Sequence, residues 1–343
     1  MKTLAAILFE QHQPLVIDEV EVPVPGYGQV LVEVKVSRIC GSQIGEIDGV
    51  KGPDKYLPHL LGHEGGGIVR EIGPEVTHVK PGDHVVLHWR PGAGIQARAA
   101  EYRLGTQTIR AGSVTTFQPL TVVSENRLTV IPAEVDFEIA ALLADTITTG
   151  FGAVTRNARV EIGESVVVIG VGGIGLGTVL GAHLAGAHPL IAVDAHDHKL
   201  AKAREFGATH TVNSRAENLA DAVSRILGGP ADAVFDGTGN PAVIEQAWKI
   251  TGARGRLVLV GVMPHDRQLS LNTLPLHFGK VLTGSEGGMS RPHVDIPRYL
   301  RLLAARPFPL QNMISHRGPL TDVNALIGQM REGKATHALL VFP

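Results

Sequence analysis

Three residues suited to metal chemistry are spread over the first 145 positions of this sequence. Cys40, the only cysteine among 343 residues, lies in "RICGSQIGEIDG", His63 in "LLGHEGGG" and Asp145 in "LLADTITTGFG". Singly, each has a simpler explanation: a buried apolar thiol, a turn histidine and a helix N-cap. Together, a thiolate, an imidazole and a carboxylate can bind zinc and leave the fourth position open, as a catalytic zinc site requires. The set therefore predicts such a site.

A glycine-rich turn in "VVVIGVGGIGLG" predicts a dinucleotide site. Gly170, Gly172 and Gly175 have GxGxxG spacing between a strand and a helix. The first glycine permits a tight turn, the second lets a pyrophosphate approach the backbone, and the third lets helix and strand pack closely. The N–H groups and dipole at the helix start attract the diphosphate. Gly173 and Ile174, inside the motif, are expected to contribute to the same contact.

Asp194 favours NAD over NADP. It ends the next predicted strand, where a carboxylate can hydrogen-bond the adenosine ribose hydroxyls and repel a 2′-phosphate. No arginine follows it to bind that phosphate. Lys199, one turn further on, is either a second ribose contact or a solvated helix lysine.

The pattern of strands and helices expected to position these residues changes near residue 150. Before it, short alternating or β-branched runs separated by Pro and Gly predict antiparallel sheet in a barrel-like domain. After it, strands and helices alternate, which indicates a doubly wound parallel sheet. We therefore expect an α/β protein with a mostly-β catalytic domain, 1–147 and 291–343, and a cofactor domain, 148–290.

Composition excludes several classes of protein. The formal net charge is −2 and no Lys- or Arg-rich run occurs, which argues against nucleic acid as a ligand. No window approaches the ~18 uninterrupted apolar residues of a membrane span, and the N-terminal apolar stretch is too short for a signal peptide. A lone cysteine forms no internal disulfide, so a reducing cytoplasm is the expected location.

The complete set of motifs resembles the zinc-dependent medium-chain dehydrogenase/reductase (alcohol dehydrogenase) family over essentially the whole chain. That pattern joins a cysteine and a small hydroxyl residue to Gly-His-Glu, "VKPGDHVV", a Cys or Asp before a Thr-Gly pair, the glycine-rich turn and a closing Gly-Lys segment. The matching positions are Cys40 with Ser42, Gly62 to Glu64, Lys80 to Val86, Asp145 with Thr149 and Gly150, Gly170 to Gly175, and Gly333 with Lys334.

The resemblance implies a GroES-like catalytic domain, a Rossmann cofactor domain and a homodimer or homotetramer. It implies that Cys40, His63 and Asp145 bind the catalytic zinc, with Glu64 as an outer or alternate ligand. It assigns the alcohol proton to Ser42, and the nicotinamide contacts to Thr149, Val260 and Val262. The implied activity is oxidation of a primary or secondary alcohol by hydride transfer to NAD. A polyol dehydrogenase, a zinc-free quinone or enone reductase, and a non-catalytic NAD-binding protein are the alternatives.

The chain also departs from the family pattern. With one cysteine it cannot hold the four-cysteine structural zinc of many relatives, so residues 88–112 must be ordered by packing or by a neighbouring subunit. Gln43 and Gly45 replace the usual aspartate and relay histidine, and His337 replaces an arginine expected near the diphosphate. Trp89 is either a pocket wall or part of the core. Four arginines in the altered stretch either converge on an anionic group or are spread over the surface: Arg90, Arg98, Arg103 and Arg110.

Overall fold

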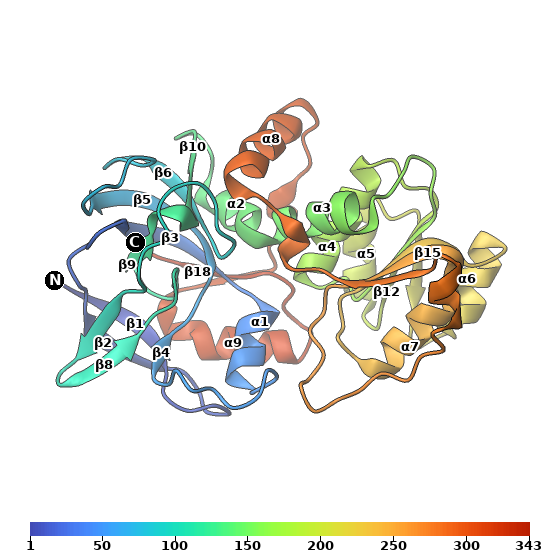
Figure 1. Ribbon diagram of the computed structural model, residues 1–343, viewed down its shortest axis with the longest axis horizontal. Coiled ribbons are helices and arrows are strands. Elements are labelled where there is room, and N and C mark those ends of the chain that lie inside the picture. Colours follow the sequence, from blue (N-terminus) through green and yellow to red (C-terminus); the bar gives the residue numbers. More distant parts are fainter. The chain divides into compact units, whose positions relative to one another are not determined.

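All residues, 1–343, are described in a computed structural model, in which the chain forms two units. Met1–Asp145 and Arg291–Pro343 form the first, and Thr146–Ser290 forms the second. Figure 1 shows the strand-rich first unit and the second unit with its sheet and surrounding helices. The predicted fold class, a mostly-β domain joined to a doubly wound parallel sheet, is confirmed.

A closed barrel in the first unit includes strands from residues 88–112, the stretch that lacks the cysteines of a structural zinc. The hairpin β7–β8 supplies two of its strands, and Tyr102 and Ile109 on that hairpin are fully buried in the barrel core. Packing within the chain therefore orders this stretch. The barrel strands, in order, are β1 (Lys2–Leu8), β2 (Val16–Glu21), β7 (Glu101–Leu104), β8 (Gln107–Arg110) and β4 (His59–Leu60).

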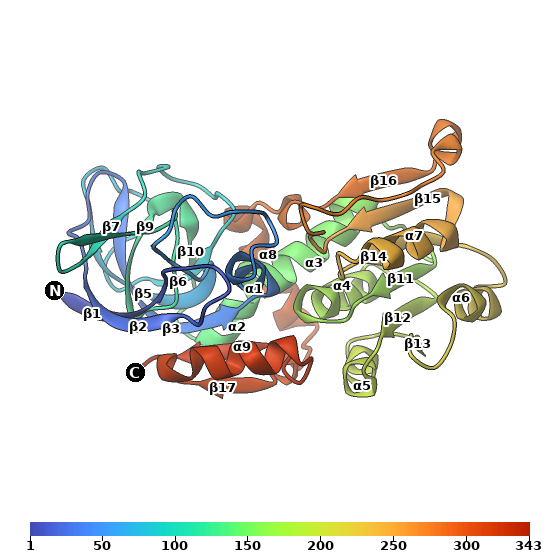
Figure 2. The same ribbon diagram turned by 90° about the horizontal axis from the view of Figure 1, so that it is seen from below.

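A second sheet of the first unit is built around the alternating stretch "QVLVEVKVSRI", which forms the long strand β3. β3 pairs with β5 along one side, and with β9 and β18 along successive parts of the other. Helix α9 lies beside β17 at one end of this sheet (Figure 2). The strands are β10 (Leu128–Ile131), β6 (His84–His88), β5 (Glu64–Ile72), β3 (Gln29–Ile39), β18 (Ala338–Val341), β17 (His316–Gly318) and β9 (Leu120–Ser124).

The helices of the first unit are few and short. Helix α1 follows β3 directly, and α2 leads into Asp145, so both are positioned to supply site residues. The helices are α1 (Gly41–Ile47), α2 (Phe137–Leu142), α8 (Pro292–Ala305) and α9 (Val323–Arg331), with 3₁₀ turns at Glu125–Arg127, Leu310–Met313 and Leu320–Asp322.

The second unit contains a six-stranded parallel sheet in the order β13-β12-β11-β14-β15-β16 (Figure 2). The chain leaves β11 to one side for β12 and returns on the other side at β14, so the loop after β11 lies at the switch point where such folds bind ligands. The strands are β11 (Val166–Ile169), β12 (Leu190–Asp194), β13 (His210–Asn213), β14 (Ala231–Asp236), β15 (Thr251–Leu259) and β16 (Val281–Gly284).

Hydrophobic side chains on one face of this sheet pack with those of two helices, Leu219–Leu227 and Pro241–Ile250, to form a core of the second unit. Its helices are α3 (Thr148–Gly152), α4 (Gly173–Leu184), α5 (Asp197–Glu205), α6 (Leu219–Leu227) and α7 (Pro241–Ile250), with 3₁₀ turns at Leu274–Phe278 and Gly287–Met289.

An uninterrupted helical run, Phe137–Ala158, is long and apolar enough to cross a membrane by length and composition alone. Because 83% of its apolar window is buried inside the protein, it is better described as a core helix. Two stretches of the run have π-helical hydrogen bonding, Leu143–Ile147 and Ala153–Ala158. Asp145 lies in the first of these, so it is not the N-cap that its sequence context suggested.

We predict that His88 makes the fold sensitive to mild acid. Its ring is fully buried, with Nδ1 2.7 Å from the Arg90 carbonyl and Nε2 2.9 Å from the Thr129 hydroxyl, and burial lowers the pKa of His88 to about 4. Below an unfolded-state pKa of about 6.5, the unfolded chain therefore binds more protons than the folded chain. The free energy of unfolding should fall by about 2 kcal/mol on this account between pH 7 and pH 5.

Urea titrations at the two pH values provide the measurement. In His88→Asn the loss of stability on acidification should be smaller than in the unmodified protein by about that amount. His210→Asn, which changes an exposed ring on β13, is the control and should keep the full loss. An equal loss in all three proteins would contradict the assignment.

Candidate metal centre and cofactor turn

Four potential metal ligands meet in the first unit. One donor atom each from Cys40, His63, Glu64 and Asp145 lies within 4.8 Å of the others. Cys40 Sγ is 3.7 Å from Asp145 Oδ2, and His63 Nε2 is 3.8 Å from the same oxygen. Tetrahedral zinc with bonds of about 2.0–2.3 Å places its ligand atoms about 3.3–3.8 Å apart. The structure thus brings the three residues suggested by the sequence to the spacing of a tetrahedral site.

Local backbone geometry explains how the cysteine and the histidine reach this point. Cys40 directly follows β3 and is the N-cap of α1, and its backbone N–H donates to Gln43 Oε1 at 2.9 Å. Gly62, directly before His63, has a φ of +90°, and a Cβ there would lie 2.4 Å from Thr116 Oγ1. Only glycine suits this turn. The turn delivers His63 and Glu64 together at the start of β5.

A buried arginine neutralises part of the negative charge. Arg38, 1% exposed, donates from Nε to Glu64 Oε2 at 2.8 Å, and its Nη2 lies 3.9 Å from Asp145 Oδ2. Burial alone would lower the pKa of Arg38, but the charges of Glu64, Cys40 and Asp145 hold it above its usual value. Burial raises the pKa of Glu64, and Arg38 opposes that rise. Arg38 is not among the residues predicted from the sequence, although a charged residue two positions before Cys40 in an apolar strand is a visible signal.

The remaining negative charge attracts a further cation. Burial lowers the pKa of His63, but its interactions with Asp145 and Cys40 outweigh burial and raise that pKa well above the ordinary value. A proton on His63 therefore supplies positive charge when no metal does. Metal ligands bind in their deprotonated forms, so a divalent ion would replace that proton.

Unpartnered buried atoms provide a second sign that the cluster suits a metal. His63 Nε2, Glu64 Oε1 and Ser42 Oγ are buried and have no hydrogen-bond partner. Buried polar atoms in native proteins almost always have one. The donor set of sulfur, imidazole nitrogen and carboxylate oxygen is one that zinc accepts. The residues present therefore fit a zinc ion.

Two further side chains touch the ligands. Trp89 Nε1 donates to Asp145 Oδ1 at 3.1 Å, which leaves Oδ2 directed at the cluster, and its ring centroid is 6.4 Å from that of His63. Gln43 bonds to His63 Nδ1 through its side-chain nitrogen. The sequence analysis noted Trp89 only as a pocket wall or core residue, and Gln43 only as a departure from the family pattern. Their contacts depend on tertiary approach, which spacing does not reveal.

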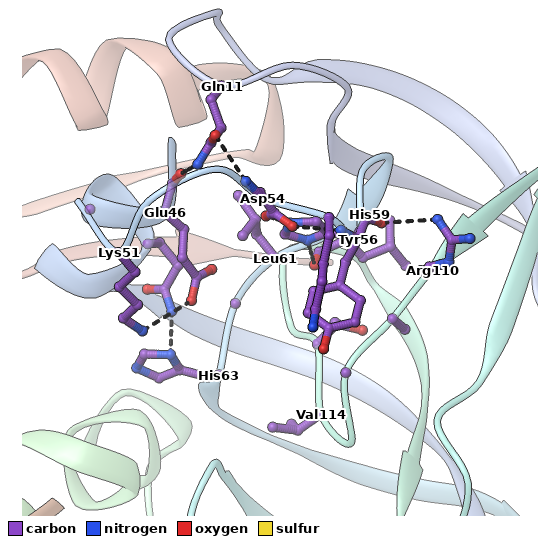
Figure 3. A pocket seen from close by; sticks show the side chains of 18 of the residues that line it. Gln11, Glu46, Lys51, Asp54, Tyr56, His59, Leu61, His63, Arg110 and Val114 are labelled. Carbon is purple, nitrogen blue, oxygen red and sulfur yellow. Dashed lines mark hydrogen bonds and ion pairs between the residues drawn. The ribbon is translucent and has the colours of Figure 1, made fainter. Parts of the chain in front are cut away.

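A cavity of about 680 Å³ adjoins the cluster, with His63 and Gln43 on its wall. Figure 3 shows His63 at one end and Arg110 at the other, with Tyr56 between them. Of the four arginines singled out in the sequence, only Arg110 lines this cavity. Arg98 is exposed and pairs with Glu101, so the alternative in which all four converge is wrong. Trp89 does not line this cavity either.

The glycine-rich turn of the second unit has the geometry expected of a diphosphate site. Gly170 has a φ of +83°, and a Cβ on Gly175 would lie 2.0 Å from the Gly170 carbonyl oxygen, so strand and helix pack too closely for a side chain. Gly172 is the N-cap of α4 without a side-chain cap, and a Cβ there would meet nothing within 4 Å. Gly173 and Ile174 form the first turn of α4. Free N–H groups facing open space suit an anion.

Asp194 lies at the end of β12, next to this turn. Its Oδ2 accepts from the Val171 N–H at 3.1 Å, and its Oδ1 from the N–H of His196 at 3.0 Å. The carboxylate is thus held against the glycine-rich turn by the backbone on both sides. Lys199 is half-buried on α5, which begins three residues after Asp194.

The other expected cofactor residues also lie in the second unit. Thr149 is buried on α3, whereas Val260 and Val262 follow β15. The Asp236 carbonyl accepts from the N–H groups of Val260 and Gly261, which fixes this segment, and Val262 is 57% exposed. His337, which replaces the arginine of the family pattern, is fully buried in the first unit, where burial and the charge of Arg38 lower its pKa.

Comparison with known proteins places this architecture in a family. Residues 26–133 match the model of the alcohol dehydrogenase GroES-like domain, and residues 173–305 match that of zinc-binding dehydrogenases. The chain is 31% identical over 376 residues to an S-(hydroxymethyl)glutathione dehydrogenase of Paracoccus denitrificans, and 32% identical over 378 residues to a class-3 alcohol dehydrogenase of Cereibacter sphaeroides. Both comparisons cover 100% of each chain.

The fold of the chain is also similar to those of solved structures. An alcohol dehydrogenase zinc-binding domain protein from Burkholderia ambifaria superposes with a TM-score of 0.91 at 28% identity, covering 100% of this chain and 99% of the other. Benzyl alcohol dehydrogenase from Acinetobacter calcoaceticus gives 0.90 at 24% identity, covering 100% of both, and that likeness concerns the fold alone.

These comparisons confirm the predicted activity, a zinc- and NAD-dependent alcohol dehydrogenase, and disfavour the non-catalytic alternative. Similarity over its full length, together with matches to both domain models, shows that the chain belongs to the zinc-dependent medium-chain dehydrogenase/reductase family.

Proposed function

We propose that Cys40, His63 and Asp145 hold a single catalytic zinc, with Glu64 as an outer or alternate ligand. The observation that carries this proposal is that Cys40 Sγ and His63 Nε2 lie 3.7 and 3.8 Å from Asp145 Oδ2, while His63 Nε2 is buried without a hydrogen-bond partner. A structural zinc is not proposed, because Cys40 is the only cysteine and packing orders the altered stretch.

Bound zinc supplies Lewis acidity that lowers the pKa of a coordinated hydroxyl, and NAD supplies the hydride acceptor. Ser42 takes the alcohol proton, since its Oγ is buried, has no partner and stands two residues from Cys40. Neither Gln43 nor Gly45 can titrate, so the proton leaves Ser42 through water. Arg38 holds Glu64 in place and offsets its charge. Trp89 fixes the orientation of Asp145.

In the second unit, the proposed NAD contacts follow the order of the dinucleotide. The N–H groups of the turn from Gly170 to Gly175 bind the diphosphate, and Asp194 binds the adenosine ribose, with Lys199 as a second contact. Thr149, Val260 and Val262 form the wall beside the nicotinamide. A polyol remains the alternative substrate class within the same chemistry.

We also propose a cytoplasmic homo-oligomer. The "RLVLVGV" stretch begins in β15, which lies between β14 and β16, so β16 offers the open edge of the sheet. Val281 on β16 is 40% exposed, and Phe278 just before it is 69% exposed. An exposed strand edge flanked by apolar side chains favours pairing with a second copy. A reducing compartment would keep Cys40 available as a thiolate ligand.

Removing either anionic ligand should remove the metal. We expect about one zinc per chain in the purified protein, and a large loss of zinc in Cys40→Ser and in Asp145→Asn. Loss of an outer-shell partner alone costs roughly 10–100-fold, so NAD-linked turnover of a simple alcohol should fall by more than about 100-fold. Elemental analysis and absorbance of NADH provide the two readouts. Asp266→Asn, on an exposed loop, is the control. Turnover that persists in zinc-depleted Cys40→Ser would contradict the site.

Gln43 should limit zinc affinity. A histidine that binds zinc through Nε2 carries a proton on Nδ1 and donates it to an acceptor. Here Gln43 presents its NH₂ group to Nδ1, because its oxygen already accepts from Cys40. Gln43→Glu places a carboxylate oxygen there and keeps the bond to Cys40, so zinc should bind about 10–100-fold more tightly.

Competition with a chromogenic chelator measures that affinity. Gln107→Glu adds the same charge at an exposed position on β8 and should leave the affinity unchanged. Unaltered or weaker zinc binding in Gln43→Glu would refute the role assigned to this contact.

Asp194 should set the choice of cofactor. We expect kcat/KM for NAD to exceed that for NADP, because the carboxylate repels a 2′-phosphate. Asp194→Asn removes the charge and keeps an oxygen acceptor for one of the two N–H groups, so the NAD:NADP ratio should fall by about 10-fold or more. Asp197→Asn, exposed at the start of α5, is the matched control. A ratio that Asp194→Asn does not change would show that another group discriminates.

A further inference from the structure

We propose that the alcohol substrate carries an anionic group, a carboxylate or a phosphate, which Arg110 and Lys55 bind at the outer end of the 680 Å³ cavity. The inference rests on the proposed function, because it takes His63, a proposed zinc ligand, to lie at the end of the cavity where the alcohol is oxidised.

Most of the charged side chains that line the cavity are already paired. The Asp54 carboxylate lies 2.8 Å from His59 Nε2, and the Glu46 carboxylate lies 3.8 Å from Lys51 Nζ. No carboxylate of the protein pairs with Arg110 or with Lys55, whose ammonium lies 5.3 Å from the Tyr56 ring centroid. The cavity therefore retains two uncompensated cations, and Figure 3 shows one of them, Arg110, at the end opposite His63.

Arg110 is anchored so that part of its guanidinium stays available. It ends β8, and its backbone N–H donates to the Pro58 carbonyl at 3.1 Å. Nη1 donates to the carbonyls of Tyr56 and Leu57 at 3.4 and 3.2 Å, whereas Nε and Nη2 make no such bond. These two N–H groups form the edge that binds a carboxylate or phosphate in bidentate fashion.

The strand geometry bounds the separation of the two residues at the ends of the cavity. Arg110 pairs with His59 across β8 and β4, and His63 follows four residues later. At about 3.3 Å per residue, and about 4.8 Å between paired strands, the backbone positions of Arg110 and His63 are at most about 18 Å apart. Between them the wall includes the buried side chains of Leu60, Leu61 and Val114. The matching ligand has a hydroxyl at one end, an anion at the other and an apolar chain between.

Matched substrates of one chain length test this inference on the zinc-loaded enzyme with NAD. We expect kcat/KM for 6-hydroxyhexanoate or 6-hydroxyhexyl phosphate to exceed that for 1-hexanol by at least 10-fold. The methyl ester of 6-hydroxyhexanoate should behave like 1-hexanol. The better of the two anions identifies the group that is recognised. Arg110→Gln should reduce the preference for the anion by 10-fold or more, whereas Arg103→Gln, an exposed change on neighbouring β7, should retain it.

Binding of hexanoate and of inorganic phosphate, measured by calorimetry, gives a readout without turnover. Binding that Arg110→Gln weakens and Arg110→Lys partly restores supports the anion site, even if no alcohol is oxidised and the proposed function fails. Oxidation of 1-hexanol with no preference for either anion, and no effect of Arg110→Gln on binding, overturns this inference alone. If Arg110→Gln does not fold, Lys55→Gln provides the same reading, because the Lys55 side chain is exposed and has only an aromatic contact.

Discussion

The buried ion pair between Arg38 and Glu64 is the constraint on which the first unit depends. Two carboxylates and a thiol are held within 4.8 Å of His63 in an interior where isolated charges are unstable. One guanidinium, 2.8 Å from Glu64 and 3.9 Å from Asp145, offsets only part of that charge. Interactions with Asp145 and Cys40 raise the pKa of His63, so the remaining negative charge favours a cation at this point. The negative charge that Arg38 does not offset destabilises the metal-free cluster. The same charge gives the cluster affinity for a divalent ion.

Secondary structure achieves this with few residues. Arg38 lies near the end of β3 and Cys40 follows the strand directly in extended backbone, so the two side chains, two positions apart, share one face. The ligand and the cation that balances its neighbours therefore arrive together. The left-handed turn at Gly62 delivers His63 and Glu64 as an adjacent pair. Asp145 comes from a π-helical stretch, where the wider turn shifts side chains out of α-helical register. Irregular backbone thus occurs where two of the ligand-bearing segments enter the cluster.

The sequence predicted the ligand types and the glycine-rich turn because their chemistry lies in local patterns. Cys40, His63 and Asp145 are identifiable by residue type, and Gly170 to Gly175 by spacing between a strand and a helix. The partners of these residues were not predictable. Nothing local shows that Gln43 reaches the imidazole or that the Trp89 indole reaches Asp145, since both contacts depend on how distant segments meet. The arginines near residue 100 illustrate the same limit, because only the strand pairing of β8 with β4 brings Arg110 to the cavity.

The charges of the first unit are arranged along one direction, from a carboxylate-rich cluster to a cationic rim. In water with salt, charges interact strongly only within about 8–10 Å. The thiolate and two carboxylates of the cluster are balanced by Arg38 and a bound divalent ion, so the metal-loaded cluster has no net charge with which to bind an anionic substrate. Arg110 and Lys55 line the cavity without a carboxylate partner, so the anion of a substrate is attracted to them instead. A metal centre built from buried anionic ligands therefore leaves the recognition of an anion to residues of the cavity outside the cluster.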